Sequence, residues 1–145
     1  MKIYIAAAYQ RQEEMRRIRQ ELRLMGHAVT SRWLDQKSAT VFGWTVADIE
    51  KGLYEVQEQA RRDIEDITAA QAVFSFTDGD LARGGRHVEF GIAIALGKRL
   101  WVIGPREHIF HSLGRVACYP DWQDLAREME SWAIDMRELV EGASE

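Results

Sequence analysis

The sequence has little cysteine and no long apolar run. Cys118 is the single cysteine, which excludes an internal disulfide framework and suits a reducing compartment. No apolar run reaches the roughly 18 residues that cross a bilayer, and no basic stretch leads into a cleavable apolar segment. We therefore predict no membrane partner and expect a cytoplasmic protein. The net charge of −4 gives no overall attraction to nucleic acid polymers.

The length and composition are those of one folded domain. The chain has 145 residues, of which 46% are hydrophobic and 29% charged. A chain of this size can bury a core without staples. We predict a single domain over residues 1–145.

Strand and helix patterns alternate along the chain. Short apolar runs predict strands at residues 2–8, 27–33, 72–77, 99–104 and 116–119. Helical periodicity predicts helices at residues 11–25, 46–70, 85–96 and 121–140, and a loop at 35–45. Gly26 and Gly97 follow two of these helices, Asp121 is the expected N-cap of the last, and Gly52 could break the second.

This alternation predicts an α/β fold with helices on both faces of a mostly parallel sheet. We expect a flavodoxin-like, Rossmann-like three-layer sandwich whose five strands lie in the order 2-1-3-4-5. The strand order then reverses between the first and third strands. Ligands of such folds bind at that point, outside the carboxyl ends of the strands, where residues 8–11 and 77–86 would lie.

The segment DLARGGRHVEFGIAIALG at residues 80–97 carries a lone carboxylate, Glu89, ahead of an apolar helix. Complementing the helix dipole from the first turn is one interpretation. A functional one is that Gly84 and Gly85 let a ligand approach the backbone and that the amides nearby bind an anion. The segment has neither the Lys-Ser/Thr of a Walker A loop nor G-x-G-x-x-G.

Three motifs together resemble the nucleoside 2-deoxyribosyltransferase family, including the related deoxynucleoside 5′-monophosphate N-glycosidases. They are the strand IYIAAAY, Asp63 in ARRDIEDI, and E-x-G-x-A-x-A-x-G from Glu89 to Gly97. The resemblance runs from residue 1 to about residue 110. It implies that Glu89 is the nucleophile at C1′ of the deoxyribose, that Asp63 binds the sugar and assists, and that Tyr4 orients the nucleophile.

The implied chemistry suits these residue types. Cleavage of an N-glycosidic bond builds positive charge on the sugar, and a carboxylate can stabilise that charge or form a covalent ester. The carboxylate has to be ionised, so we expect the Tyr4 hydroxyl and the helix N-terminus to hold the pKa of Glu89 down. The predicted function is cleavage or transfer at the N-glycosidic bond of a 2′-deoxynucleoside or its 5′-monophosphate, without a cofactor.

Two arginines mark a departure from the family. Arg83 stands six residues before the glutamate, where the transferases carry an aspartate and the monophosphate hydrolases a serine. With Arg86 and the Gly85 amide it could bind a phosphate; the alternative is two solvated surface charges. Tyr9 and Arg11 could add contacts to the same anion, although the Gly/Ser-rich loop of the hydrolases is missing here.

Aromatic and histidine residues elsewhere have weaker signals. Trp33 could stack on a base, or belong to the core or a dimer contact. The resemblance implies that the region after the fourth strand reaches a neighbouring subunit, so His111 and Ser112 are predicted to touch ligand across a homodimer or higher oligomer. His108 and His111, with Cys118 seven residues later, are too few for zinc, and no metal site is predicted.

A non-catalytic module that binds a nucleotide-derived ligand is the main alternative function. A pure anion binder would gain nothing from a carboxylate beside the phosphate, so Glu89 favours the enzyme. Phospho-acceptor and FMN-binding proteins of flavodoxin-like fold are disfavoured, because the expected acidic residues and Ser/Thr-rich phosphate loop are missing.

Overall fold

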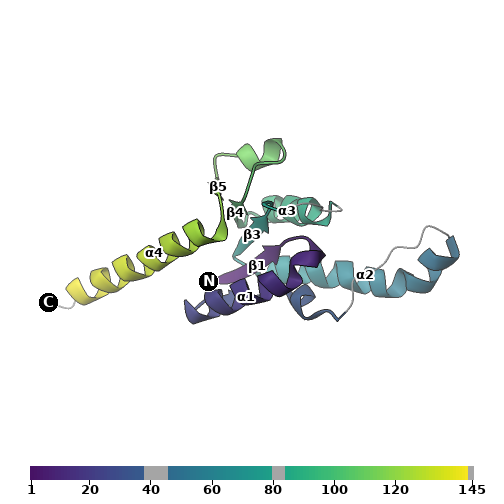
Figure 1. The fold of residues 1–145 in the computed structure, drawn as a ribbon, viewed down its shortest axis with the longest axis horizontal. Helices are drawn as coiled ribbons and strands as arrows, with labels where there is room; N and C mark the ends of the chain where they lie inside the picture. The colour runs from purple at the N-terminus through teal and green to yellow at the C-terminus, as the bar shows by residue number, and fades with distance from the viewer. Residues whose placement is uncertain (38–45, 80–83, 144–145) are drawn as a thin grey trace.

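A five-stranded parallel sheet forms the centre of the structure, a computed structural model that describes residues 1–37, 46–79 and 84–143 (Figure 1). The strands are β1 (Lys2–Ala6), β2 (Ala28–Val29), β3 (Ala72–Phe76), β4 (Arg99–Ile103) and β5 (Val116–Tyr119). Their order is β2-β1-β3-β4-β5, and every neighbouring pair is parallel. The predicted fold class and strand order are confirmed.

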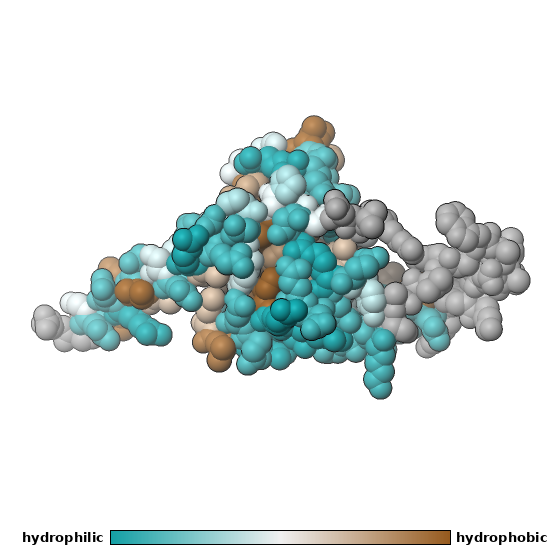
Figure 2. Space-filling view, viewed as in Figure 1, coloured by the Kyte–Doolittle hydropathy of each residue, from teal (hydrophilic) through white to brown (hydrophobic). Residues whose placement is uncertain are grey.

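Helices cover both faces of this sheet. They are α1 (Gln12–Leu24), α2 (Val46–Ala69), α3 (Gly85–Ala95) and α4 (Trp122–Gly142), with short 3-10 helices η1 (Tyr9–Arg11), η2 (Arg32–Asp35) and η3 (Ile109–Ser112). α2 continues through Gly52 without a break. The surface seen in Figure 2 is mainly hydrophilic. The second half of α4 is an exception, because Ile134, Met136, Leu139 and Val140 are exposed there. Within the described residues, no helix combines the length and apolar character of a membrane span.

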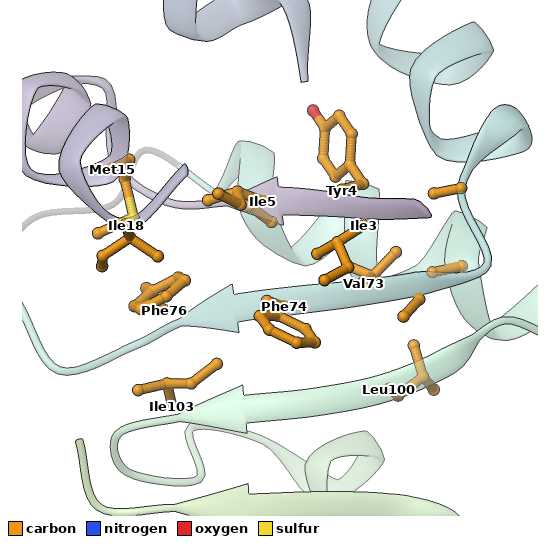
Figure 3. Close-up of a cluster of buried hydrophobic side chains, with 14 of the residues drawn as sticks. Ile3, Tyr4, Ile5, Met15, Ile18, Val73, Phe74, Phe76, Leu100 and Ile103 are labelled. Atoms are coloured by element: carbon orange, nitrogen blue, oxygen red, sulfur yellow. The ribbon is translucent and has the colours of Figure 1, made fainter. Parts of the chain in front are cut away.

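The strand register divides the core between the two faces of the sheet. Ile5 pairs with Phe74, so both side chains lie on one face, where Phe74 also packs 6.5 Å from Trp122 of α4. Figure 3 shows Met15 of α1 on this side. Tyr4 alternates with Ile5 and therefore faces the other layer, where α2 and α3 lie against β1 and against each other. The alternation of side chains along β1 therefore points the Tyr4 side chain toward α2 and α3.

The second strand is shorter than predicted. Only Ala28 and Val29 pair with β1, although the sequence pattern predicts a strand over residues 27–33. After Thr30, side chains replace the backbone as hydrogen-bond partners of β1. Ser31 Oγ accepts a hydrogen bond from Ile5 N (2.7 Å), and Trp33 Nε1 donates to Ile5 O (2.8 Å). Since the backbone groups of β1 are satisfied in this way, the chain is free to turn into η2.

Gly104, directly after β4, holds the ends of β3 and β4 together. Its φ is +119°, and a Cβ there would overlap Asp78 N and lie 2.7 Å from Thr77 Oγ1. Gly104→Ala is therefore expected to lower the free energy of unfolding by roughly 3 kcal/mol or more, measured by urea denaturation. Gly26 is the matched control, because it has φ +88° but no atom within 4 Å of a built Cβ. Similar losses for Gly26→Ala and Gly104→Ala would contradict the role of close contact at Gly104.

Candidate active site

Tyr4 and Glu89 meet between β1 and α3. The Tyr4 hydroxyl donates a hydrogen bond to Glu89 Oε1 (2.8 Å). Tyr4 is completely buried, whereas Glu89 keeps some exposure; Figure 3 shows the tyrosine standing off β1 with its hydroxyl at the far end. The contact joins residues 85 positions apart in sequence and fixes one carboxylate oxygen of Glu89.

Glu89 lies further along its helix than predicted. α3 begins at Gly85 after the left-handed Gly84, and its first turn contains no acidic residue. The dipole effect falls off within the first turn. The interpretation of Glu89 as a simple dipole complement is therefore weakened, and its contact with Tyr4 becomes the main feature to explain.

Asp63 of α2 completes a group of three. It is partly buried, and Gln59 one turn earlier donates from Nε2 to its Oδ1 (2.8 Å). Burial is the main cause that raises the pKa of Asp63 to about 6. The negative charge of Asp63 also raises the pKa of Glu89. The three residues predicted to be catalytic thus come together at one site.

The pKa of Glu89 is raised, not held down. Burial raises it to about 8, and the charge of Asp63 adds to the rise, while the hydrogen bond from Tyr4 opposes it. The expectation that Tyr4 and the helix would depress this pKa is wrong, because the cost of desolvating a carboxylate exceeds what one hydroxyl returns. At pH 7 these pKa values favour ionised Asp63 and protonated Glu89.

Asp66, one turn after Asp63, has a structural role. It is 5% exposed and accepts hydrogen bonds from Arg32 N (2.8 Å) and Arg32 Nε (2.7 Å). These contacts attach α2 to η2. Two aspartates on one helix thus differ in environment, since Asp66 faces an arginine and Asp63 faces only Gln59 among its described hydrogen-bond partners.

Arg11 is already paired with carboxylates. Its guanidinium donates to Glu14 (2.7 and 2.8 Å) and to Asp78 (2.6 Å), and it lies over the Phe76 ring. Binding a ligand anion would require exchange of these partners. Tyr9 lies beside it in η1, and its hydroxyl donates to Gln36 O (3.3 Å).

Trp33 is a core residue. It is 7% exposed, and its ring N–H donates to the Ile5 carbonyl. Its ring lies 6.5 Å from Tyr9. This position matches the core alternative, and the small exposed area leaves little of the ring for stacking on a base.

Gly85 and Arg86, both predicted to bind phosphate, differ in exposure. Gly85 is exposed at the start of α3, but Arg86 is 6% exposed and forms an ion pair with Glu107. Arg83 lies outside the described residues. Ser112 is exposed at the end of η3, while His111 beside it is fully buried, so of these two residues only the serine lies at the surface.

Sequence reasoning missed two supporting residues. Gln59 precedes Asp63 by four positions, a spacing that brings side chains together on a helix and could have been read. Glu107 is 21 positions from Arg86, and nothing local in the sequence marks this pair.

Removal of the tyrosine hydroxyl tests its link to Glu89. Tyr4→Phe deletes the one interaction among those described that lowers the pKa of Glu89. We expect that pKa to rise further, measured as the NMR titration profile of the Glu89 carboxyl carbon. An unchanged profile in a folded variant would show that the hydroxyl does not support the carboxylate.

Two solved structures share this fold. A 2-deoxyribosyltransferase from the psychrotolerant bacterium Bacillus psychrosaccharolyticus superposes with a TM-score of 0.58 at 23% identity, covering 87% of this chain and 90% of that one. The CMP N-glycosidase BcmB of Clostridium botulinum superposes with a TM-score of 0.56 at 16% identity, covering 90% and 99%. No protein-family model and no curated protein matches the sequence. At these identities the similarity establishes the fold.

Proposed function

We propose that this chain cleaves or transfers at the N-glycosidic bond of a 2′-deoxynucleoside or its 5′-monophosphate, with Glu89 as nucleophile. The observation that carries the proposal is the hydrogen bond from buried Tyr4 to Glu89, with Asp63 close enough to raise the pKa of Glu89. The fold adds support, because a deoxyribosyltransferase and a CMP N-glycosidase share it.

The reaction begins at the free oxygen of Glu89. Tyr4 binds Oε1, so Oε2 is the oxygen that attacks C1′ of the sugar. The C1′–N bond breaks, and its electron pair leaves with the base, which takes up a proton. A glycosyl ester on Glu89 results. Water or a second base then attacks C1′ from the opposite side and releases the carboxylate, so the configuration is retained.

The protonation states set the order of events. Glu89 is mainly protonated at pH 7, and its proton passes to solvent water before attack. The developing positive charge of the sugar then stabilises the ionised carboxylate, most strongly in a site that excludes water. Asp63, held by Gln59, is placed on α2 to bind the sugar hydroxyls.

Substrate binding draws on the surrounding loops. Tyr9, Arg11, Gly85 and Arg83 remain proposed contacts for the base or 5′ group, and Ser112 is proposed to reach the site of a second copy in a homodimer or larger oligomer. Ile109 beside it is 79% exposed, and Figure 2 shows apolar side chains over this η3 region at the top of the view. An apolar tip of this kind suits a subunit contact.

A non-catalytic binding module is the second candidate. The raised pKa of Glu89 favours this candidate. A protonated carboxyl group can donate a hydrogen bond to a neutral ligand, and such binding requires no reaction.

A substrate panel separates the two functions. Wild-type protein is incubated with the four deoxynucleosides and their 5′-monophosphates, and released base is measured by chromatography. The enzyme predicts release from at least one compound; release only when a second free base is supplied identifies transfer. If no compound of the panel releases base and at least one of them raises the melting temperature, the binding module is favoured and the proposal is overturned.

A further inference from the structure

Three of the four histidines form a cluster that the proposed chemistry does not use. His87 belongs to α3, while His108 and His111 come from the segment around η3. The ring centroids lie 4.8 Å apart for His87 and His108, and 3.7 Å apart for His108 and His111. One ring nitrogen of each residue lies within 4.8 Å of the other two. Side chains 24 positions apart along the chain therefore converge on one small volume.

Each ring presents a buried nitrogen without a partner. His87 Nδ1, His108 Nδ1 and His111 Nε2 have no hydrogen-bond partner among the described residues. His111 is fully buried, whereas His87 has a side-chain exposure of 34%. Unpaired buried nitrogens are costly and call for an explanation. A single ligand bound between the rings would give all three nitrogens a partner.

Contacts with Glu107 decide which nitrogens offer lone pairs. Its carboxylate lies 3.1 Å from His87 Nε2, which places the ring proton there and leaves the Nδ1 lone pair free. A carboxylate behind a histidine is the usual second layer of a metal site. Glu107 N donates to His111 Nδ1 (3.1 Å), so the ring proton of neutral His111 is on Nε2. A metal that binds at Nε2 moves this proton to Nδ1, and the hydrogen bond from Glu107 N is lost.

The charged side chains around the cluster carry a net positive charge. Arg86 precedes His87 in α3, and Arg106 Nε donates to the His111 carbonyl (3.4 Å), so both positive charges oppose a bound cation. Glu107 pairs with Arg86 and offsets part of this repulsion. The donors themselves are neutral imidazoles, which first-row divalent metals such as Zn²⁺ accept more readily than Mg²⁺ or Ca²⁺ do.

We propose that His87, His108 and His111 bind one Zn²⁺ ion, with water in the fourth position. Zn–N bonds of about 2.0–2.1 Å place ligand nitrogens roughly 3.3 Å apart, so the rings close in by about 1.5 Å at most. The ion attaches the start of α3 to the segment after β4. His87 and Glu89 are two positions apart, about 200° around the helix, so the ion lies away from the catalytic carboxylate.

The test is Zn²⁺ binding to the purified full chain. Metal-free protein is titrated with Zn²⁺ against a chromophoric chelator, and Co²⁺ replaces Zn²⁺ to report tetrahedral coordination by its visible absorption. We expect one equivalent to bind, the melting temperature to rise with Zn²⁺, and His87→Gln and His108→Gln each to bind at least tenfold more weakly. Both residues keep some exposure, so these variants are expected to fold, as circular dichroism would verify.

His27 provides the matched control. It is the fourth histidine, outside the cluster, with its Nδ1 2.9 Å from the N-terminal amine. His27→Gln is expected to bind Zn²⁺ like the wild type. Absence of stoichiometric binding, or equal weakening by His27→Gln and His87→Gln, would overturn the proposal.

Discussion

Glu89→Gln is expected to lower base release from the best substrate by about a thousandfold or more. Glutamine retains the size of the side chain and an oxygen that can accept the Tyr4 hydrogen bond, but it cannot form the glycosyl ester. The measurement is kcat/KM for base release by chromatography. Substrate binding, followed by thermal shift, is expected to survive the substitution.

The fold of this variant is expected to be at least as stable as that of the wild type. The pKa of Glu89 is raised to about 8 in the folded chain, so its contribution to stability is full below the unfolded pKa and is lost as pH rises through 8. A neutral glutamine carries no such loss. Glu89→Gln should therefore melt above the wild type at pH 8–9. Loss of activity together with a lower melting temperature would point to misfolding, and retained activity would rule out Glu89 as nucleophile.

The rate of the wild type is expected to fall steeply as the pH is lowered from 8. The profile of kcat/KM reports the pKa values of the free enzyme, and that of Glu89 is about 8. The ionised fraction of such a group drops about fiftyfold between pH 8 and pH 6. We expect kcat/KM to drop by a similar factor, measured with a substrate whose base does not titrate in this range.

Asp63→Asn is the matched control for this profile. Removing the charge of Asp63 should lower the pKa of Glu89, since that charge raises it, and shift the fall of kcat/KM to lower pH. A wild-type profile that is flat between pH 6 and pH 8, or a shift to higher pH in Asp63→Asn, would contradict the electrostatic account of the site.

The fold was predictable because its signals are local. The run Ala72–Phe76 is buried along its whole length and apolar except for Ser75, as expected of a strand covered on both faces, and Asp121 caps α4 by accepting from Asp124 N. The end of β2 was not predictable. It depends on Ser31 and Trp33 bonding to Ile5 across the sheet, and a pattern within residues 27–33 carries no sign of that contact.

The resemblance grouped three residues of the candidate site but did not predict their electrostatics. The structure joins Tyr4 to Glu89 by a hydrogen bond and puts Asp63 near enough to raise the pKa of Glu89, while the catalytic roles of the three stay predictions. The direction of the Glu89 pKa depends on how much of the carboxylate water can reach, which only the packed structure supplies. The partner of Arg86 was also hidden, because Glu107 comes from a segment 21 residues away. The same segment brings His108 and His111 to His87.

The most direct test of the central claim is to trap the glycosyl ester. A 2′-fluorinated arabinosyl nucleoside slows both steps, because fluorine destabilises the positive charge on the sugar. The wild type is incubated with this compound, digested and mapped by mass spectrometry. The account predicts one glycosyl adduct on the peptide that contains Glu89 and none in Glu89→Gln. An adduct on another residue of an active enzyme would contradict it.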